Sequence, residues 1–188
     1  MQRVLVERAM AGDHDAFAEL ARVSIRRLYI VARLILRDEG RAEDATQEAL
    51  LAAWTHLAAL RDPDRFEPWL RRLLINACYR EASRGQRRRS IETRIEPLAM
   101  SEASDGIDMG LELAGRDQLE RGFRRLDPDQ RTVLVLHYYL GLSLDEAADT
   151  LGIPPGTVRS RLSRAISAMR AALEADARSP LLNQGRPA

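Results

Sequence analysis

The sequence predicts an all-α protein of two small helical domains joined by a flexible linker. Alanine, leucine and arginine dominate its 188 residues, whereas aromatic residues make up only 5%. Apolar residues recur at three- and four-residue spacing in both halves of the chain, as one face of a helix requires. Between the halves, residues 91–117 combine proline, glycines and many acids without long apolar periodicity, which is typical of a flexible linker. Residues 176–188 are expected to form a disordered tail.

The first domain, residues 1–90, is expected to contain three main helices. The first spans residues 13–37 and opens on an aspartate suited to the N-cap, and Gly40 is expected to break it. The second runs from about residue 42 to 57. Asp62 precedes a proline, the usual pair at an N-cap and first helical position, and predicts a third helix that continues into an arginine cluster.

The second domain, residues 118–175, is expected to contain four helices. A short one covers 119–125. Two capping boxes, Asp-Pro-Asp-Gln and Ser-Leu-Asp-Glu, then open helices over 128–140 and 143–151. After a turn that contains glycine, a Pro-Pro pair begins the last helix, which runs to about residue 173.

Charge is distributed unevenly along the chain although the formal net charge is only +1. Residues 71–90 carry seven arginines against one glutamate, whereas the linker carries seven acids against two arginines. Residues 156–170 carry four arginines and no acid. Two basic islands separated by an acidic spacer predict two sites for a polyanion.

The last helix has the pattern of a DNA-reading helix. On a helical wheel its apolar residues fall within one arc, and a polar face of arginine, serine and threonine lies opposite. Arginine binds guanine bidentately in the major groove, and hydroxyl groups suit phosphates. Together with the preceding helix and turn, this predicts a helix-turn-helix. The expected DNA contacts are Thr157, Arg159, Ser160, Arg161, Ser163 and Arg164.

Several classes of function are not indicated. Acids within the first fifteen residues argue against a secretory signal, and charges interrupt every long apolar stretch. Cys78 is the only cysteine, and the three histidines are isolated, so no metal site is predicted. No glycine-rich phosphate loop or nucleophile cluster is visible. We therefore expect a cytoplasmic protein without enzymatic activity, metal, cofactor, small-molecule substrate or membrane insertion.

Both halves resemble bacterial sigma factors of the extracytoplasmic-function (ECF) group, in the sigma-70 family. The first half resembles sigma region 2 through Asp15-Ala16-Phe17 with Glu19-Leu20, Glu43-Asp44-Ala45-Thr46-Gln47-Glu48, Phe66, Trp69-Leu70 and Asn76. The second resembles region 4 through Leu126, Gln130-Arg131, Gly141, Ser143, Glu146-Ala147-Ala148, Leu151-Gly152 and the run from Gly156 to Leu162. These motifs cover roughly residues 13–84 and 119–173 in the order and spacing of the family.

The resemblance implies a transcription initiation factor that directs core RNA polymerase to promoters. Region 4 would bind the −35 element, while region 2 would read and open the −10 element. It also implies that Asp44, Gln47 and Glu48 dock on the polymerase, and that an anti-sigma factor is a further partner.

For −10 recognition and melting, the resemblance implies that the loop from Leu57 to Phe66 captures an unstacked base. A cationic groove with aromatic side chains suits single-stranded DNA. Trp54, Phe66 and Trp69 have the spacing of core residues, however, which favours a packing role for these three. Tyr79 is the better candidate for a contact with DNA. The expected contacts are Asn76, Tyr79, Arg80, Arg84, Arg87 and Arg88. The chain departs from the family pattern after Asn76, where Arg80 and Ser83 replace the usual Asp and Arg.

Two other interpretations compete with this one. A conventional helix-turn-helix regulator would act without docking on polymerase, and it would leave the first half unexplained. An enzyme with a DNA-binding domain is supported by no cluster of acid, base or nucleophile. Co-purification with core polymerase is expected only of a sigma factor.

Overall fold

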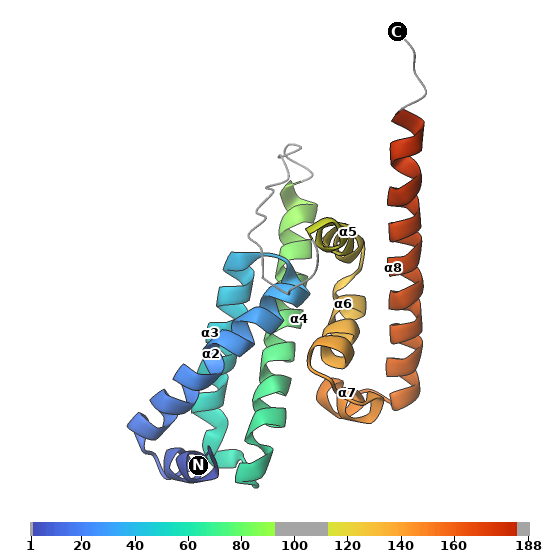
Figure 1. Ribbon diagram of the computed structural model, residues 1–188. Coiled ribbons are helices and arrows are strands. Elements are labelled where there is room, and N and C mark those ends of the chain that lie inside the picture. The colour runs from blue at the N-terminus through green and yellow to red at the C-terminus, as the bar shows by residue number, and fades with distance from the viewer. Residues whose placement is uncertain (1, 93–112, 184–188) are drawn as a thin grey trace. The chain divides into compact units, whose positions relative to one another are not determined.

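The computed structural model describes residues 2–92 and 113–183, and the side chains of 86–92, 113–118 and 176–183 are not among the described parts. All regular structure within these ranges is helical, which confirms the predicted fold class (Figure 1). The chain divides into two units. The first unit is built on α1 (Gln2–Met10), α2 (His14–Leu36), α3 (Glu39–His56) and α4 (Phe66–Glu92). The second is built on α5 (Leu113–Arg124), α6 (Pro128–Leu134), the part of α7 (Leu144–Leu151) up to Ala148, and α8 (Pro155–Asn183).

The boundary between α2 and α3 differs from the sequence prediction. Asp13 caps α2 as expected, since its carboxylate accepts a hydrogen bond from the Ala16 amide at 3.0 Å. The helix ends because Arg37 adopts a left-handed conformation, with φ 56°. Asp38 then caps α3. The expectation that Gly40 breaks a helix is wrong, because Gly40 lies in the first turn of α3 and the aspartate two residues earlier sets the boundary.

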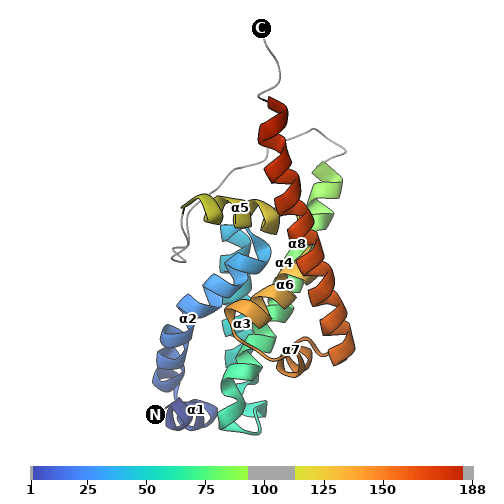
Figure 2. The same ribbon diagram turned by 45° about the vertical axis from the view of Figure 1, so that its right-hand side comes forward.

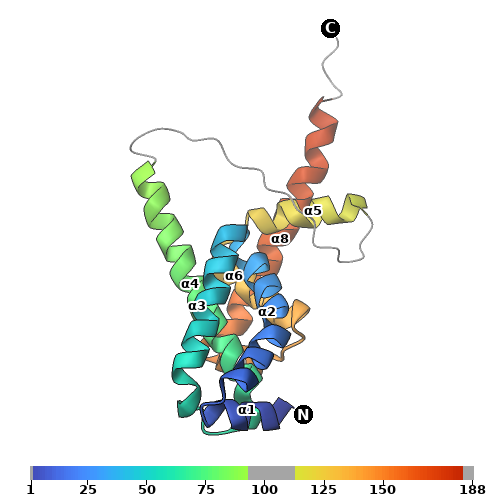
Figure 3. The ribbon, with the colours of Figure 1, turned by 90° about the vertical axis from the view of Figure 1, so that its left-hand side faces the viewer.

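Helices α2, α3 and α4 pack against one another, and α1 packs on α2 (Figure 3). Four alanines, Ala42, Ala45, Ala49 and Ala53, line α3 at three- and four-residue spacing, and all are fully buried. Side chains this small let neighbouring helices approach closely. Larger residues, including Ile35, Phe66 and Leu70, complete the core.

The third predicted helix begins with a tighter turn than expected. Asp62 accepts a hydrogen bond from the Asp64 amide at 3.0 Å, which confirms it as an N-cap. The residues that follow, Pro63–Arg65, form a 3₁₀ turn, and α4 begins at Phe66. Helix α1 was not predicted.

In the second unit, α5 and α6 pack on α8, and Figure 2 shows α5 meeting α8 from the side. Both predicted capping boxes are confirmed. The first joins Asp127 and Gln130 at the start of α6. The second joins the backbone amide and side chain of Ser143 to Glu146 at the start of α7.

Two helix ends differ from the prediction in this unit. The helix expected over 128–140 changes after Leu134 into a wider, π-helical turn, Val135–Tyr139, in which the Leu140 amide donates to the Val135 carbonyl at 3.0 Å. Helix α8 continues to Asn183. Helix α8 therefore includes residues 176–183 of the tail that was expected to be disordered. Residues 93–112 of the expected linker and 184–188 of the expected tail lie outside the described residues.

Among the described residues, no helix combines the length and the apolar character that crossing a lipid bilayer requires.

Candidate nucleic-acid interfaces

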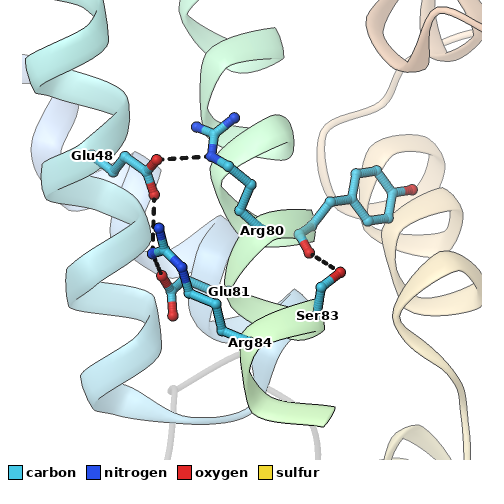
Figure 4. Close-up of polar contacts among 6 residues, drawn as sticks. Glu48, Arg80, Glu81, Ser83 and Arg84 are labelled. Atoms are coloured by element: carbon cyan, nitrogen blue, oxygen red, sulfur yellow. Dashed lines mark hydrogen bonds and ion pairs between the residues drawn. The ribbon is translucent and has the colours of Figure 1, made fainter. Parts of the chain in front are cut away.

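Arg80 and Arg84, both expected to contact DNA, form ion pairs with two glutamates. The Nε atom of Arg80 lies 2.8 Å from Oε1 of Glu48 on α3. Nη1 of Arg84 lies 3.8 Å from Oε2 of the same carboxylate and also contacts Glu81 on its own helix. Figure 4 shows these contacts between α3 and α4. We refer to Glu48, Arg80, Glu81 and Arg84 as the ionic cluster.

One carboxylate of the ionic cluster, that of Glu81, is nearly buried and needs its cationic partner to be stable there. The side chain of Glu81 is only 8% exposed, and a carboxylate at such depth is stable when a cation and hydrogen bonds compensate its lost hydration. The hydrogen bond and charge of Glu81 raise the pKa of Arg84 above its usual value, with smaller contributions from the charges of Glu48 and Asp44. Arg84 therefore remains a cation at neutral pH.

The three residues expected to dock on polymerase have unequal exposure. Asp44 and Gln47 are exposed on α3, whereas Glu48 is half-buried because it belongs to the ionic cluster. Leu51, one turn beyond Gln47 on this face, is 66% exposed. The sequence analysis did not single out Leu51, although its position off the buried alanine stripe was a signal for exposure.

The residues expected to contact the −10 region lie along α4. Asn76 and Arg80, one turn apart, are both exposed. Tyr79 is partly buried, and its backbone carbonyl accepts a hydrogen bond from the Ser83 hydroxyl at 2.9 Å. Arg87 and Arg88 belong to the last turns of α4, and their side chains lie outside the described ones.

Three aromatic residues of this region have packing contacts. Phe66 is 2% exposed. The rings of Trp54 and Phe17 lie 4.9 Å apart, and those of Trp69 and Phe66 lie 6.1 Å apart. These contacts agree with the packing role that their spacing indicates.

The predicted turn between α7 and α8 is present. Gly152 adopts a left-handed conformation, with φ 66°, that residues with a side chain rarely accept. The Ile153 amide then donates to the Ala148 carbonyl at 3.2 Å, which closes the end of α7. Two residues later α8 begins, so the two helices are joined as in a helix-turn-helix.

The polar face of α8 agrees with the helical wheel. Val158, Leu162 and Ala165 are buried. The exposed residues are Arg159, Ser160, Ser163 and Arg164, whereas Thr157 is partly buried. The Arg164 Nε donates to the Ser160 carbonyl at 3.3 Å.

Arg161 differs from the other arginines of this helix. Its Nη1 lies 3.1 Å from Oδ2 of Asp129 on α6, and its side chain is 26% exposed. An arginine in such a pair gives up part of its donor capacity within the protein. Arg159 and Arg164 are exposed, whereas Arg161 is held against α6.

Comparison with known proteins assigns the family. A model of sigma-70 region 2 matches residues 20–89, and a model of sigma-70 region 4 matches residues 116–169. The ECF RNA polymerase sigma-E factor of Escherichia coli (strain K12) is 32% identical over 178 residues, which cover 89% of this chain and 91% of that protein. The chain belongs to the sigma-70 family, in its ECF group.

One further curated protein and one solved structure are similar to this sigma factor. The "Probable RNA polymerase sigma factor RfaY" of Xanthomonas campestris pv. campestris is 34% identical over 166 residues, which cover 86% of this chain but only 41% of that protein. The sigma factor RpoE of Bartonella quintana, solved in complex with the anti-sigma factor NepR, has the same fold. Its TM-score is 0.67 at 24% identity, with 85% of this chain and 98% of that chain covered.

Proposed function

We propose that this sigma factor directs core RNA polymerase to promoters through three surfaces. The exposed face of α3 with Asp44 and Gln47 docks on the polymerase, and Glu48 joins it from the ionic cluster. Helix α4 holds the opened −10 region with Asn76, Tyr79 and its arginines. Helix α8 binds the −35 element in the major groove. The first domain, residues 1–90, therefore binds core polymerase and the −10 region, and the second domain, residues 118–175, binds the −35 element.

One observation supports this division above the others. The same chain carries an acid-and-amide face on α3 and an acid-free arginine and hydroxyl face on α8, in separate units. An acidic face complements a basic protein surface, whereas guanidinium and hydroxyl groups complement DNA. RNA synthesis itself is the polymerase's reaction, and the sigma factor is not an enzyme.

The alternative, a helix-turn-helix regulator that acts without polymerase, is not favoured. It accounts for α7 and α8 but gives no role to the region 2 match over residues 20–89. We infer two further properties from the family. The chain acts in the cytoplasm, and an anti-sigma factor is a partner, as NepR is for the B. quintana sigma factor.

Association with core polymerase tests the proposal. The purified full chain is mixed with core polymerase free of other sigma factors and analysed by gel filtration. A one-to-one complex is expected. A chain that elutes alone, while still binding duplex DNA, would favour the regulator.

The geometry of α8 predicts different effects for its arginines. Replacing Arg159 or Arg164 by Ala is expected to weaken −35 binding by about 1–3 kcal/mol, because a bidentate arginine–guanine contact contributes about that much. Arg161→Ala is expected to cost less than about 1 kcal/mol, because its partner is Asp129. Fluorescence anisotropy with a duplex selected by the wild-type chain measures the three affinities. A loss confined to Arg161→Ala would contradict this assignment.

A further inference from the structure

We propose that Glu48 is a switch that couples polymerase docking to DNA binding. In the free sigma factor it holds Arg80 and Arg84 in ion pairs, and when core polymerase engages Glu48, the arginines become available to the opened promoter strand. This inference rests on the proposed function, because it requires α3 to dock on polymerase and α4 to bind DNA.

Glu48 belongs to the face of α3 that is proposed to dock on polymerase, and it contacts the arginines of α4 that are proposed to bind DNA. Its two carboxylate oxygens face different arginines of α4, Oε1 at 2.8 Å from Arg80 and Oε2 at 3.8 Å from Arg84 (Figure 4). The side chain of Glu48 is 31% exposed, so a cation from a partner has access to it. A basic group that takes up these oxygens competes directly with the arginines for the same lone pairs.

The charges of the ionic cluster cancel in the free protein. Two carboxylates, Glu48 and Glu81, face two guanidinium groups, so this part of α4 presents no net positive charge to a phosphate backbone. The side chains of Arg80 and Arg84 are nevertheless 48% and 61% exposed. A phosphate therefore has access to both arginines as soon as Glu48 is engaged elsewhere.

The two arginines differ in how far they are released. Within the described residues, Arg80 has Glu48 as its carboxylate partner, whereas Arg84 also contacts the buried Glu81. Arg80 is therefore released from its ion pair more completely than Arg84 when polymerase engages Glu48. Because binding linkage is reciprocal, DNA held by Arg80 also frees Glu48 for polymerase.

Binding of single-stranded DNA to the free full-length chain tests the switch. The variant Glu48→Gln removes the charge that holds the arginines while keeping the shape of the side chain. We expect it to bind a fluorescein-labelled random-sequence oligonucleotide about two- to fivefold tighter than wild type, which is the range of exposed ion pairs. The matched control is Glu19→Gln, which makes the same charge change and frees Arg22 from a 2.7 Å pair on α2. It is expected to bind as wild type does.

The double variant Glu48→Gln/Arg80→Gln identifies the source of the gain, because its net charge equals that of wild type. The gain is expected to disappear in it. An affinity of Glu48→Gln equal to wild type, an equal gain in Glu19→Gln, or a gain that survives in the double variant would each overturn the switch. The proposed function fails separately, when Arg80→Gln holoenzyme opens promoters as well as wild type and Asp44→Arg still binds core polymerase.

Discussion

Asp44→Arg is expected to lower the affinity of the sigma factor for core polymerase by about a hundredfold, because like charges placed across an interface cost several kcal/mol. Asp44 is exposed on α3, so the same change is expected to leave the fold stable. The structure makes Asp44 a better position than Glu48 for this reversal. An arginine at Glu48 would face Arg80 and Arg84, and a loss of binding there could come from disruption of the ionic cluster.

The control for this prediction is Glu19→Arg, which makes the same charge change at a half-exposed position of α2. Competition with labelled wild-type sigma factor for core polymerase measures both affinities, and thermal unfolding followed by circular dichroism checks the fold. Asp44→Arg that competes as strongly as Glu19→Arg would remove this face of α3 from the polymerase interface.

The double variant Arg87→Gln/Arg88→Gln is expected to reduce open-complex formation by about tenfold or more while leaving −35 binding intact. Both residues belong to the last turns of α4 and neither is a member of the ionic cluster, so this variant keeps all four residues of the cluster. In the proposed function, the positive charge that these substitutions remove stabilises the melted strand, whose bases unstack at a cost of a few kcal/mol.

Permanganate reactivity of promoter thymines measures the opening. A template with a pre-melted −10 bubble is expected to restore part of the lost reactivity, because the protein no longer has to bear the cost of unstacking. The control variant Arg22→Gln/Arg26→Gln removes two exposed arginines from α2. If Arg87→Gln/Arg88→Gln gives wild-type reactivity on closed DNA, the prediction is contradicted. The arginines at the end of α4 would then have no role in promoter opening.

Local features were predictable from the sequence because their causes lie within a few residues. Both capping boxes join residues three apart, and the buried face of α8 follows from the helical period alone. The error at Gly40 has a local cause as well. Asp38 offered a competing cap, and the left-handed Arg37 that ends α2 is a conformation that arginine seldom adopts.

The ionic cluster and the pair of Arg161 with Asp129 could not be predicted in the same way. Glu48 and Arg80 are 32 positions apart, and they meet only because the alanine stripe draws α3 close to its neighbours. Arg161 lies on the polar face of α8, so a helical wheel cannot distinguish it from Arg164. The contact with α6 alone makes that distinction.

The π-helical turn Val135–Tyr139 likewise depends on contacts beyond its own residues. The ring nitrogen Nδ1 of His137 lies 2.8 Å from the carbonyl oxygen of Leu142, and the Leu142 amide donates to the Leu136 carbonyl at 3.1 Å. These contacts tie the helix end to the loop that follows it. A helical pattern of apolar residues carries no signal for such a turn.

Transcription from a library of random promoter sequences tests the central claim most directly. Purified core polymerase is supplied with the full-length chain, and the RNA products are sequenced together with the templates that produced them. We expect transcripts only when both proteins are present, from templates enriched in two short elements at a fixed spacing. RNA yields no higher than those of core polymerase alone, or templates without a shared upstream element, would contradict the assignment of this chain as a promoter-directing sigma factor.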